Sequence, residues 1–241
     1  MPKFRHSLDN QATWTTVNAG AAQVIPSAPG QTAFLEAIGD AVTSQAPLFL
    51  NDTFTTATAK AITAHVGESG NSWLHNPATP VANVLQVGTG GSIYGATALV
   101  GIANSQVVPA SASYFVEAEF IIRSVLSSIS ATIGGRSSNA DAAYYGMFYE
   151  DGFVRLVRAD AAGARTILAS VAYTPALGTP FTMRVVMAGN QISGWLNGTQ
   201  VIAPITDNTI TRVGTVMVRI FGQSSSPTTG PHISNVTAGP L

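Results

Sequence analysis

The chain has 241 residues, no cysteine, and a formal net charge of −1 from 11 basic and 12 acidic side chains. Only 10% of the residues are charged, against roughly 25% in an average soluble protein, so much of the surface must consist of small or uncharged side chains. Such a surface suits a protein that is covered by copies of itself or by a larger assembly. This composition excludes disulfides, thiolate metal sites and a cysteine nucleophile, and without a basic stripe we expect no nucleic-acid partner.

The first 31 residues are polar and interrupted by Ala, Gly and Pro. They contain too little apolar surface to fold alone, so we predict an N-terminal arm. The start Met-Pro-Lys-Phe-Arg-His is basic, but no apolar run follows, and we expect no signal peptide. No stretch of the chain approaches the ~20 apolar residues of a membrane span, so we expect no membrane insertion.

Residues 32–46 show apolar side chains at helical spacing, with Pro47 as a stop. The spacing predicts one short helix, which needs a partner to be stable. Arm and helix together form a predicted segment, residues 1–50, for anchoring or oligomerisation. The candidate anchoring contacts are Phe4, Arg5, Trp14, Phe34 and Ile38.

From residue 51 onwards, strand and turn signals recur to the C-terminus. Residues 114–123 alternate strictly, with Tyr114, Val116 and Phe120 on one face. Asp151-Gly152 and Asn197-Gly198 predict tight hairpins, because both pairs tolerate positive φ. No helical crossover fits between these strands, so residues 51–241 are predicted to form an all-β, two-sheet antiparallel sandwich.

Several of these segments resemble one known family. They are Asn51-Asp-Thr-Phe54, Gly70-Asn-Ser-Trp73, Phe181-Thr-Met-Arg-Val185, Gly189-Asn-Gln-Ile192, Leu196-Asn-Gly-Thr199 and Pro231-His-Ile-Ser-Asn-Val236. In this order and spacing they resemble the concanavalin A-like lectin/glucanase (laminin-G-like) jelly roll, in the form found in bacteriophage and bacterial surface proteins. The resemblance implies a sandwich fold that hosts lectins, glucanases and purely structural modules.

Catalytic patterns are incomplete in this sequence. Glu117 and Glu119 share one strand face, whereas the glucanases of the family alternate three acids, and the third position here is Ile121. The four histidines are scattered, and those at His65 and His75 are read as solvated loop residues. We therefore expect no enzyme activity, no metal and no cofactor.

Aromatic side chains decide whether a glycan site is credible, because sugars stack on exposed rings. Tyr144 and Tyr145 occupy opposite faces of one strand, so at most one of them faces outward. Trp195 lies on the face opposite to Ile192 and Leu196. The candidate glycan or partner contacts are Trp73, His75, Tyr145 and Trp195.

These observations favour a non-enzymatic bacteriophage virion protein. It would be a capsid decoration protein or head fibre, made in the bacterial host cytoplasm and bound to the major capsid protein or another virion protein through its arm. We expect a homo-oligomer, a trimer. The alternative is a receptor-binding or tail-fibre module that binds a host surface glycan, and a third hypothesis is a glycoside hydrolase of the same fold.

Overall fold

The computed structural model describes residues 47–241, apart from residues 78, 97–99, 125–128 and 222–224, together with the backbone of three strands nearer the N-terminus. The chain divides into two compact units, Met1–Ala46 and Pro47–Leu241. None of the helices in the described part is long and apolar enough to cross a membrane.

The N-terminal unit contains a three-stranded antiparallel sheet, in which β1 (Lys3–Ser7) pairs with β2 (Thr15–Asn18) and β3 (Phe34–Ile38). The helix predicted over residues 32–46 is therefore wrong at β3, and the remainder of that range lies outside the described residues. A short, mostly apolar run is compatible with either structure. A short isolated helix is marginal because its nucleation is costly, and here the segment pairs with β1 as a strand instead. Two of the three strands lie within the predicted arm.

The second unit contains a nine-stranded and a seven-stranded sheet, both antiparallel throughout. The nine-stranded sheet consists of β4 (Leu50–Asp52), β5 (Lys60–Ala61), β7 (Gln86–Gly88), β8 (Ser92–Tyr94), β10 (Tyr114–Ile122), β15 (Phe181–Ala188), β16 (Gln191–Leu196), β17 (Thr199–Thr206) and β19 (Pro231–Pro240). Its order is β17-β16-β15-β10-β19-β8-β7-β5, and β4 pairs with β19.

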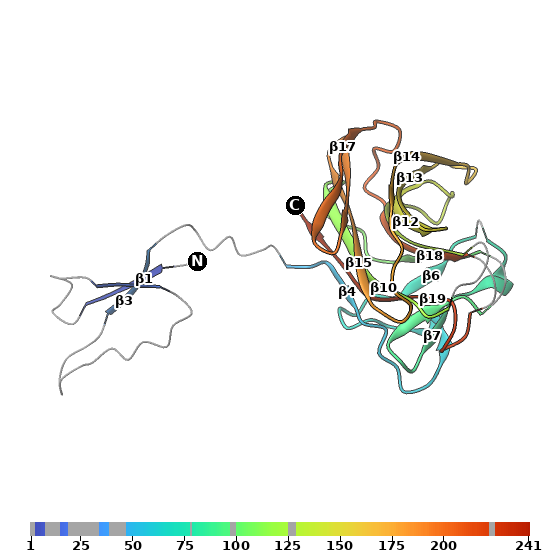
Figure 1. Ribbon diagram of the computed structural model, residues 1–241, viewed down its shortest axis with the longest axis horizontal. Coiled ribbons are helices and arrows are strands. Elements are labelled where there is room, and N and C mark those ends of the chain that lie inside the picture. Colours follow the sequence, from blue (N-terminus) through green and yellow to red (C-terminus); the bar gives the residue numbers. More distant parts are fainter. Residues whose placement is uncertain are drawn as a thin grey trace. The chain divides into compact units, whose positions relative to one another are not determined.

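The seven-stranded sheet consists of β6 (Trp73–His75), β9 (Gly101–Ser105), β11 (Ser130–Ser137), β12 (Tyr144–Glu150), β13 (Phe153–Ala159), β14 (Arg165–Ala172) and β18 (Thr215–Phe221). Its order is β14-β13-β12-β11-β18-β9-β6. Two short 3₁₀ turns, η1 (Ile62–Ala64) and η2 (Val81–Asn83), lie in the connections. Figure 1 shows the two sheets face to face, with β15 and β10 in one layer and β12 and β13 in the other. The prediction of a two-sheet antiparallel sandwich is confirmed.

The main core lies between the sheets, and β10 shows how the sequence specifies it. Its inward side chains are all buried: Tyr114, Val116, Ala118, Phe120 and Ile122. The outward residues Glu117, Glu119 and Ile121 are only half-buried, which confirms the predicted alternation. Phe115 also faces outward, and the guanidinium of Arg184 covers it at 4.5 Å from the ring centroid.

Two tight hairpins follow the predicted turn chemistry. Asp151 and Gly152 join β12 to β13 with φ of 50° and 79°. Asn197 and Gly198 join β16 to β17 with φ of 49° and 76°. Positive φ at both central residues is the conformation that lets a two-residue turn match the twist of the strands. Both hairpin predictions are confirmed.

A buried carboxylate on β4 joins segments of both sheets, because one of its partners lies on β6. Asp52 is fully buried and accepts hydrogen bonds from the Phe54 N–H at 2.7 Å, from the indole of Trp73 at 2.7 Å and from Nε2 of His65 at 2.9 Å. His65 is therefore a core residue, and its reading as a solvated loop histidine is wrong. The polar residues around His65 suggested an exposed loop. Its buried partner, Asp52, lies 13 residues earlier in the chain, so the local sequence does not reveal the pairing.

A buried arginine joins another set of loops. The guanidinium of Arg136 donates to the carbonyls of Ala112 at 2.9 Å, Ile210 at 2.7 Å and Gly189. It also lies 5.7 Å from the ring centroid of Tyr145. These bonds connect β11 with loops of the opposite sheet, so Arg136 holds the two layers together at that point.

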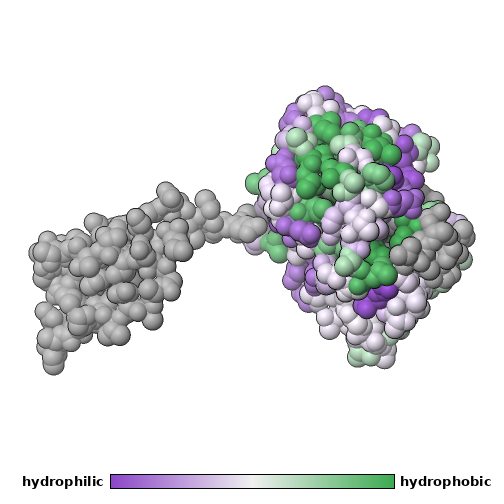
Figure 2. Space-filling model, in the orientation of Figure 1, coloured by the Kyte–Doolittle hydropathy of each residue, from purple (hydrophilic) through white to green (hydrophobic). Residues whose placement is uncertain are grey.

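The strands that end the two sheets are either short or irregular. β5 has two residues and β6 has three. β14 carries one extra residue, Leu168, opposite the Leu156–Val157 step of β13. β17 contains Pro204 and two register shifts. Figure 2 shows that strongly hydrophilic residues form only small, scattered patches on the visible face of this unit, as the low charge content predicts.

Candidate functional site

The outer face of the seven-stranded sheet carries a second apolar cluster, separate from the main core. Its buried members are Ile102, Tyr144, Phe148, Val157, Ala159 and Met217. The cluster exists because β12 is apolar on both faces: Tyr145 and Met147 point into the core, while Tyr144 and Phe148 point outward and stack with ring centroids 6.1 Å apart. Although they face outward, Tyr144 and Phe148 are buried, and the guanidinium groups of Arg165 and Arg219 lie over the Phe148 ring.

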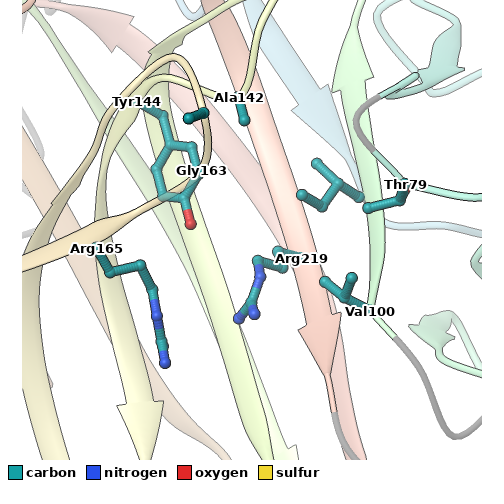
Figure 3. A pocket seen from close by; sticks show the side chains of 9 residues that line it. Thr79, Val100, Ala142, Tyr144, Gly163, Arg165 and Arg219 are labelled. Carbon is teal, nitrogen blue, oxygen red and sulfur yellow. The ribbon is translucent and has the colours of Figure 1, made fainter.

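A pocket of about 230 Å³ opens beside this cluster. It is lined by Thr79, Val100, Ile102, Ala142, Tyr144, Ala162, Gly163, Arg165 and Arg219. Figure 3 shows the Tyr144 hydroxyl and the guanidinium groups of Arg165 and Arg219 in this space, with Val100 and Thr79 on the opposite side. The pocket therefore combines apolar walls with three polar groups, although it is smaller than the ~300–1,000 Å³ of typical ligand pockets.

Arg219 comes from β18 and forms one wall of the pocket. Its side chain is 9% exposed, and Nη1 donates to the hydroxyl of Ser130 at 2.7 Å. Its guanidinium lies 5.3 Å from the ring centroid of Phe148 and 5.4 Å from that of Phe221. Burial lowers the pKa of Arg219, and the positive charge of Arg165 acts in the same direction. Arg219 therefore lies over two rings that cannot accept its N–H groups as an oxygen would, while the guanidinium carries N–H donors beyond the one bonded to Ser130.

Arg165 stands at the beginning of β14. Its guanidinium lies 5.4 Å from the same Phe148 ring, and Nη1 donates to Oε1 of Glu150 at 3.0 Å. Glu150 also accepts a hydrogen bond from Arg155 at 2.5 Å. One carboxylate thus serves two arginines at the rim of the pocket.

Tyr144 supplies the third polar group. Burial raises the pKa of its hydroxyl, so the group keeps its proton and can donate a hydrogen bond. In the part of the chain that the structure describes, no side chain or backbone group bonds to this hydroxyl. A ligand in the pocket would find an available donor and acceptor there.

Two of the predicted glycan contacts are buried in the sandwich, which corrects those predictions. Trp73 has no exposed surface, because its indole packs in the core and bonds to Asp52. Tyr145 is also fully buried, and its hydroxyl donates to Asp207 at 2.8 Å. A ring without exposed surface cannot stack on a sugar. Of the two adjacent tyrosines, Tyr144 is the one that faces the pocket.

The other two predicted contacts are not brought together. His75 is half-buried, and its Nε2 lies 2.9 Å from the carbonyl of Thr79, so it touches the pocket only through that lining residue. Trp195 is half-buried on the outer face of the other sheet, opposite to Ile192 and Leu196 as predicted. Of the candidate anchoring residues, Phe4, Arg5, Phe34 and Ile38 lie on the N-terminal strands, and Trp14 lies outside the described residues.

The carboxylates examined for catalysis lie on the outer face of the nine-stranded sheet, away from the pocket. Glu117 accepts from Arg184 Nε at 2.9 Å, and Glu119 accepts from the Ser234 hydroxyl at 2.9 Å. Each acid is therefore engaged in a surface interaction, and Ile121 occupies the next outward position. Within the described residues, no three His, Asp or Glu side chains cluster as metal ligands.

Sequence reasoning missed Arg165 and Arg219. A signal for Arg219 was present, because it is the single charge in the otherwise apolar strand Thr215–Phe221. For Arg165 the sequence carries no comparable signal, since an arginine at the exposed start of a strand is ordinary. The sheet order β14-β13-β12-β11-β18 places the two arginines on strands at either side of β12, and both line one pocket.

No family model matches the chain, and no curated protein matches it. Solved structures do match. The carbohydrate-binding module CBM66 from Bacillus subtilis is 11% identical, with a TM-score of 0.54, over 69% of this chain and 94% of the module. A β-1,3-glucanase from Mycobacterium marinum is 12% identical, with a TM-score of 0.50, over 80% of this chain and 98% of the enzyme.

A third matching structure is described by the words "Prominent members of the human gut microbiota express endo-acting O-glycanases to initiate mucin breakdown". It is 9% identical, with a TM-score of 0.53, over 81% of this chain and all (100%) of the matched chain. Identities this low establish the fold alone. The chain has the concanavalin A-like β-sandwich fold, which confirms the architecture expected from the sequence resemblance.

Proposed function

We propose that this protein is a non-enzymatic carbohydrate-binding module displayed on a bacteriophage virion. The observation that carries the proposal is the pocket on the outer face of the seven-stranded sheet, where Tyr144, Arg165 and Arg219 meet apolar walls. Sugars present hydroxyl acceptors together with apolar C–H faces, and a pocket with both kinds of lining suits them. The three similar structures include one described as a carbohydrate-binding module, which supports this choice of ligand class.

A binding role fits the chemistry of the described residues better than hydrolysis does. A glycosidase needs two carboxyl groups on either side of the scissile bond. Among the described residues that line the pocket there is no Asp or Glu, and Glu150, the acid bonded to the lining residue Arg165, is shared with Arg155. An assay of reducing-sugar release from a polysaccharide panel is expected to show none, and release abolished by Glu117→Gln would reverse this reading.

The binding proposal is tested by filling the pocket. Ala162 lines the pocket from an exposed turn, so Ala162→Trp should occlude it without disturbing the core. Ala188→Trp, at an exposed end of β15 on the other sheet, is the matched control. On a glycan array we expect binding by the wild-type protein and by Ala188→Trp, and loss with Ala162→Trp. A blank wild-type array, or binding unaffected by Ala162→Trp, would refute the site.

We propose further that the N-terminal unit attaches the protein to the virion, as a capsid decoration protein or head fibre. Support comes from the division of the chain into two compact units, Met1–Ala46 and Pro47–Leu241, so that attachment and display can be assigned to different units. Deleting residues 1–46 should abolish copurification with particles while the β-rich circular dichroism spectrum persists. Particle binding by the truncated protein would contradict the proposal, and light scattering on both proteins measures whether the expected trimer forms.

A further inference from the structure

Arg219 is a buried cation without a carboxylate partner in the described part of the chain. Its bonded neighbour is the neutral Ser130 hydroxyl, and the ion pairs of the described residues do not include it. Arg219 as a residue is only 9% exposed, so its side chain has lost most of its hydration. Burying a charge in this way is unfavourable unless an opposite charge or several hydrogen bonds replace the water.

The surrounding charges increase this imbalance. Arg165 and Arg219 lie over one ring, that of Phe148, and Arg155 lies close by. Glu150 is bonded to Arg165 and Arg155, so three positive charges face one negative charge. Asp160 lies in the turn before Arg165, but none of the ion pairs of the described residues includes it. Its Oδ1 instead accepts hydrogen bonds from the N–H groups of Ala162 and Ala164, at 2.9 Å each.

We infer that the pocket binds a saccharide through an anionic group, a carboxylate or a sulfate ester, which the guanidinium edges of Arg219 and Arg165 hold. This inference rests on the proposed function and specifies its ligand. The planar fork of an arginine matches two oxygens of such a group, and hydrogen bonds between two charged groups are the strong ones. The Tyr144 hydroxyl then bonds to the sugar, and Val100, Ile102 and Ala142 pack against its C–H groups.

The experiment compares matched acidic and neutral sugars on the full chain. The probes are glycans ending in glucuronate, sialate or galactose 6-sulfate, with glucose- and galactose-terminated counterparts, and binding is measured by calorimetry. Arg219→Met removes the inner charge, and Arg219→Lys keeps the charge without the fork. Arg184→Gln is the control, because Arg184 is a partly exposed arginine of the other sheet. Thermal unfolding verifies that each variant is folded.

We expect acidic probes to bind more tightly than their neutral counterparts, and increasingly weakly as salt concentration rises. Arg219→Met should raise the dissociation constant by roughly 10- to 100-fold, the usual effect of losing a hydrogen bond between charged groups. Arg219→Lys should give an intermediate loss, and Arg184→Gln should bind like the wild-type protein. Preference for carboxylated or for sulfated probes identifies the anion.

Three results would overturn the inference. Neutral probes that bind as tightly as acidic ones, with binding still abolished by Ala162→Trp, would leave the carbohydrate site standing and refute its anionic specificity. Acidic probes that bind equally well to Arg219→Met would also refute it. If no probe binds the wild-type protein, the proposed carbohydrate function fails together with the inference.

Discussion

Replacing Asp52 with alanine gives the sharpest test of what holds the sandwich together. Asp52 has no exposed surface, and its two oxygens accept three hydrogen bonds from segments up to 21 residues away. The packing around it is tight, since a methyl group added at Gly67 would lie 2.5 Å from Oδ2. The substitution leaves the donors of Phe54, His65 and Trp73 buried and unpaired.

The expected loss follows from those three donors. Each unpaired buried donor costs about 1–3 kcal/mol, and such costs are not additive within one network. The removal of one partner from a buried charged network typically destabilises by ~3–5 kcal/mol. We therefore expect Asp52→Ala to reduce the free energy of unfolding by about 4 kcal/mol. Asp52→Asn should recover only part of this, because its amide N–H₂ would face a donor.

Urea unfolding followed by circular dichroism measures the effect. With an m value of about 2–3 kcal/mol/M, the midpoint should fall by about 1.5 M. Glu119→Gln is the control, since it alters a half-buried carboxylate with one hydrogen bond and keeps an acceptor for Ser234, so its midpoint should barely move. A loss below about 1 kcal/mol for Asp52→Ala would refute the argument that this network joins the segments.

Three further predictions concern other parts of the sandwich. Burial, aided by the charge of Arg123, lowers the pKa of His232 to about 4, so the unfolded chain takes up a proton that the folded chain resists. The free energy of unfolding should therefore fall by about 3 kcal/mol between pH ~6.5 and ~4, and His232→Gln should flatten this slope in pH-dependent urea titrations. Gly214→Ala should lower the free energy of unfolding by at least about 2 kcal/mol in the same assay, because the φ of Gly214 is +62° and the added methyl group would collide with the backbone of Arg136. A variant as stable as the wild-type protein would contradict this. Arg136→Met should lower the melting temperature by about 4–16 °C, in line with a loss of ~2–4 kcal/mol from its carbonyl bonds, and an unchanged melting temperature would show that they contribute nothing.

The predictable parts of the fold are those set by local chemistry. The alternation in β10 and the Asp-Gly and Asn-Gly turns follow from side-chain period and backbone φ, and both appear as expected. Trp195 was also placed on the correct face, because Ile192 and Leu196 are strongly apolar neighbours that fix the core side of β16.

The unpredictable parts depend on partners distant in the sequence. Tyr144 and Tyr145 are chemically alike, and only the second sheet decides which of them enters the core. Trp73 reads as a loop aromatic until Asp52 is placed beside its indole. The strand at Phe34–Ile38 depends likewise on pairing with β1. The pocket itself draws on β12, β14 and β18, so its arginines become neighbours only in the folded sheet.

The form of the outermost strands also bears on how copies of this protein can associate. β-rich proteins polymerise when one sheet continues into the next molecule through an open strand edge. Here two of the terminal strands are only two and three residues long, one carries a bulge at Leu168, and one contains Pro204, which has no N–H to donate. These short, bulged or proline-containing end strands disfavour edge-to-edge pairing between sandwiches. Any association of sandwiches would therefore use sheet faces or loops rather than strand edges.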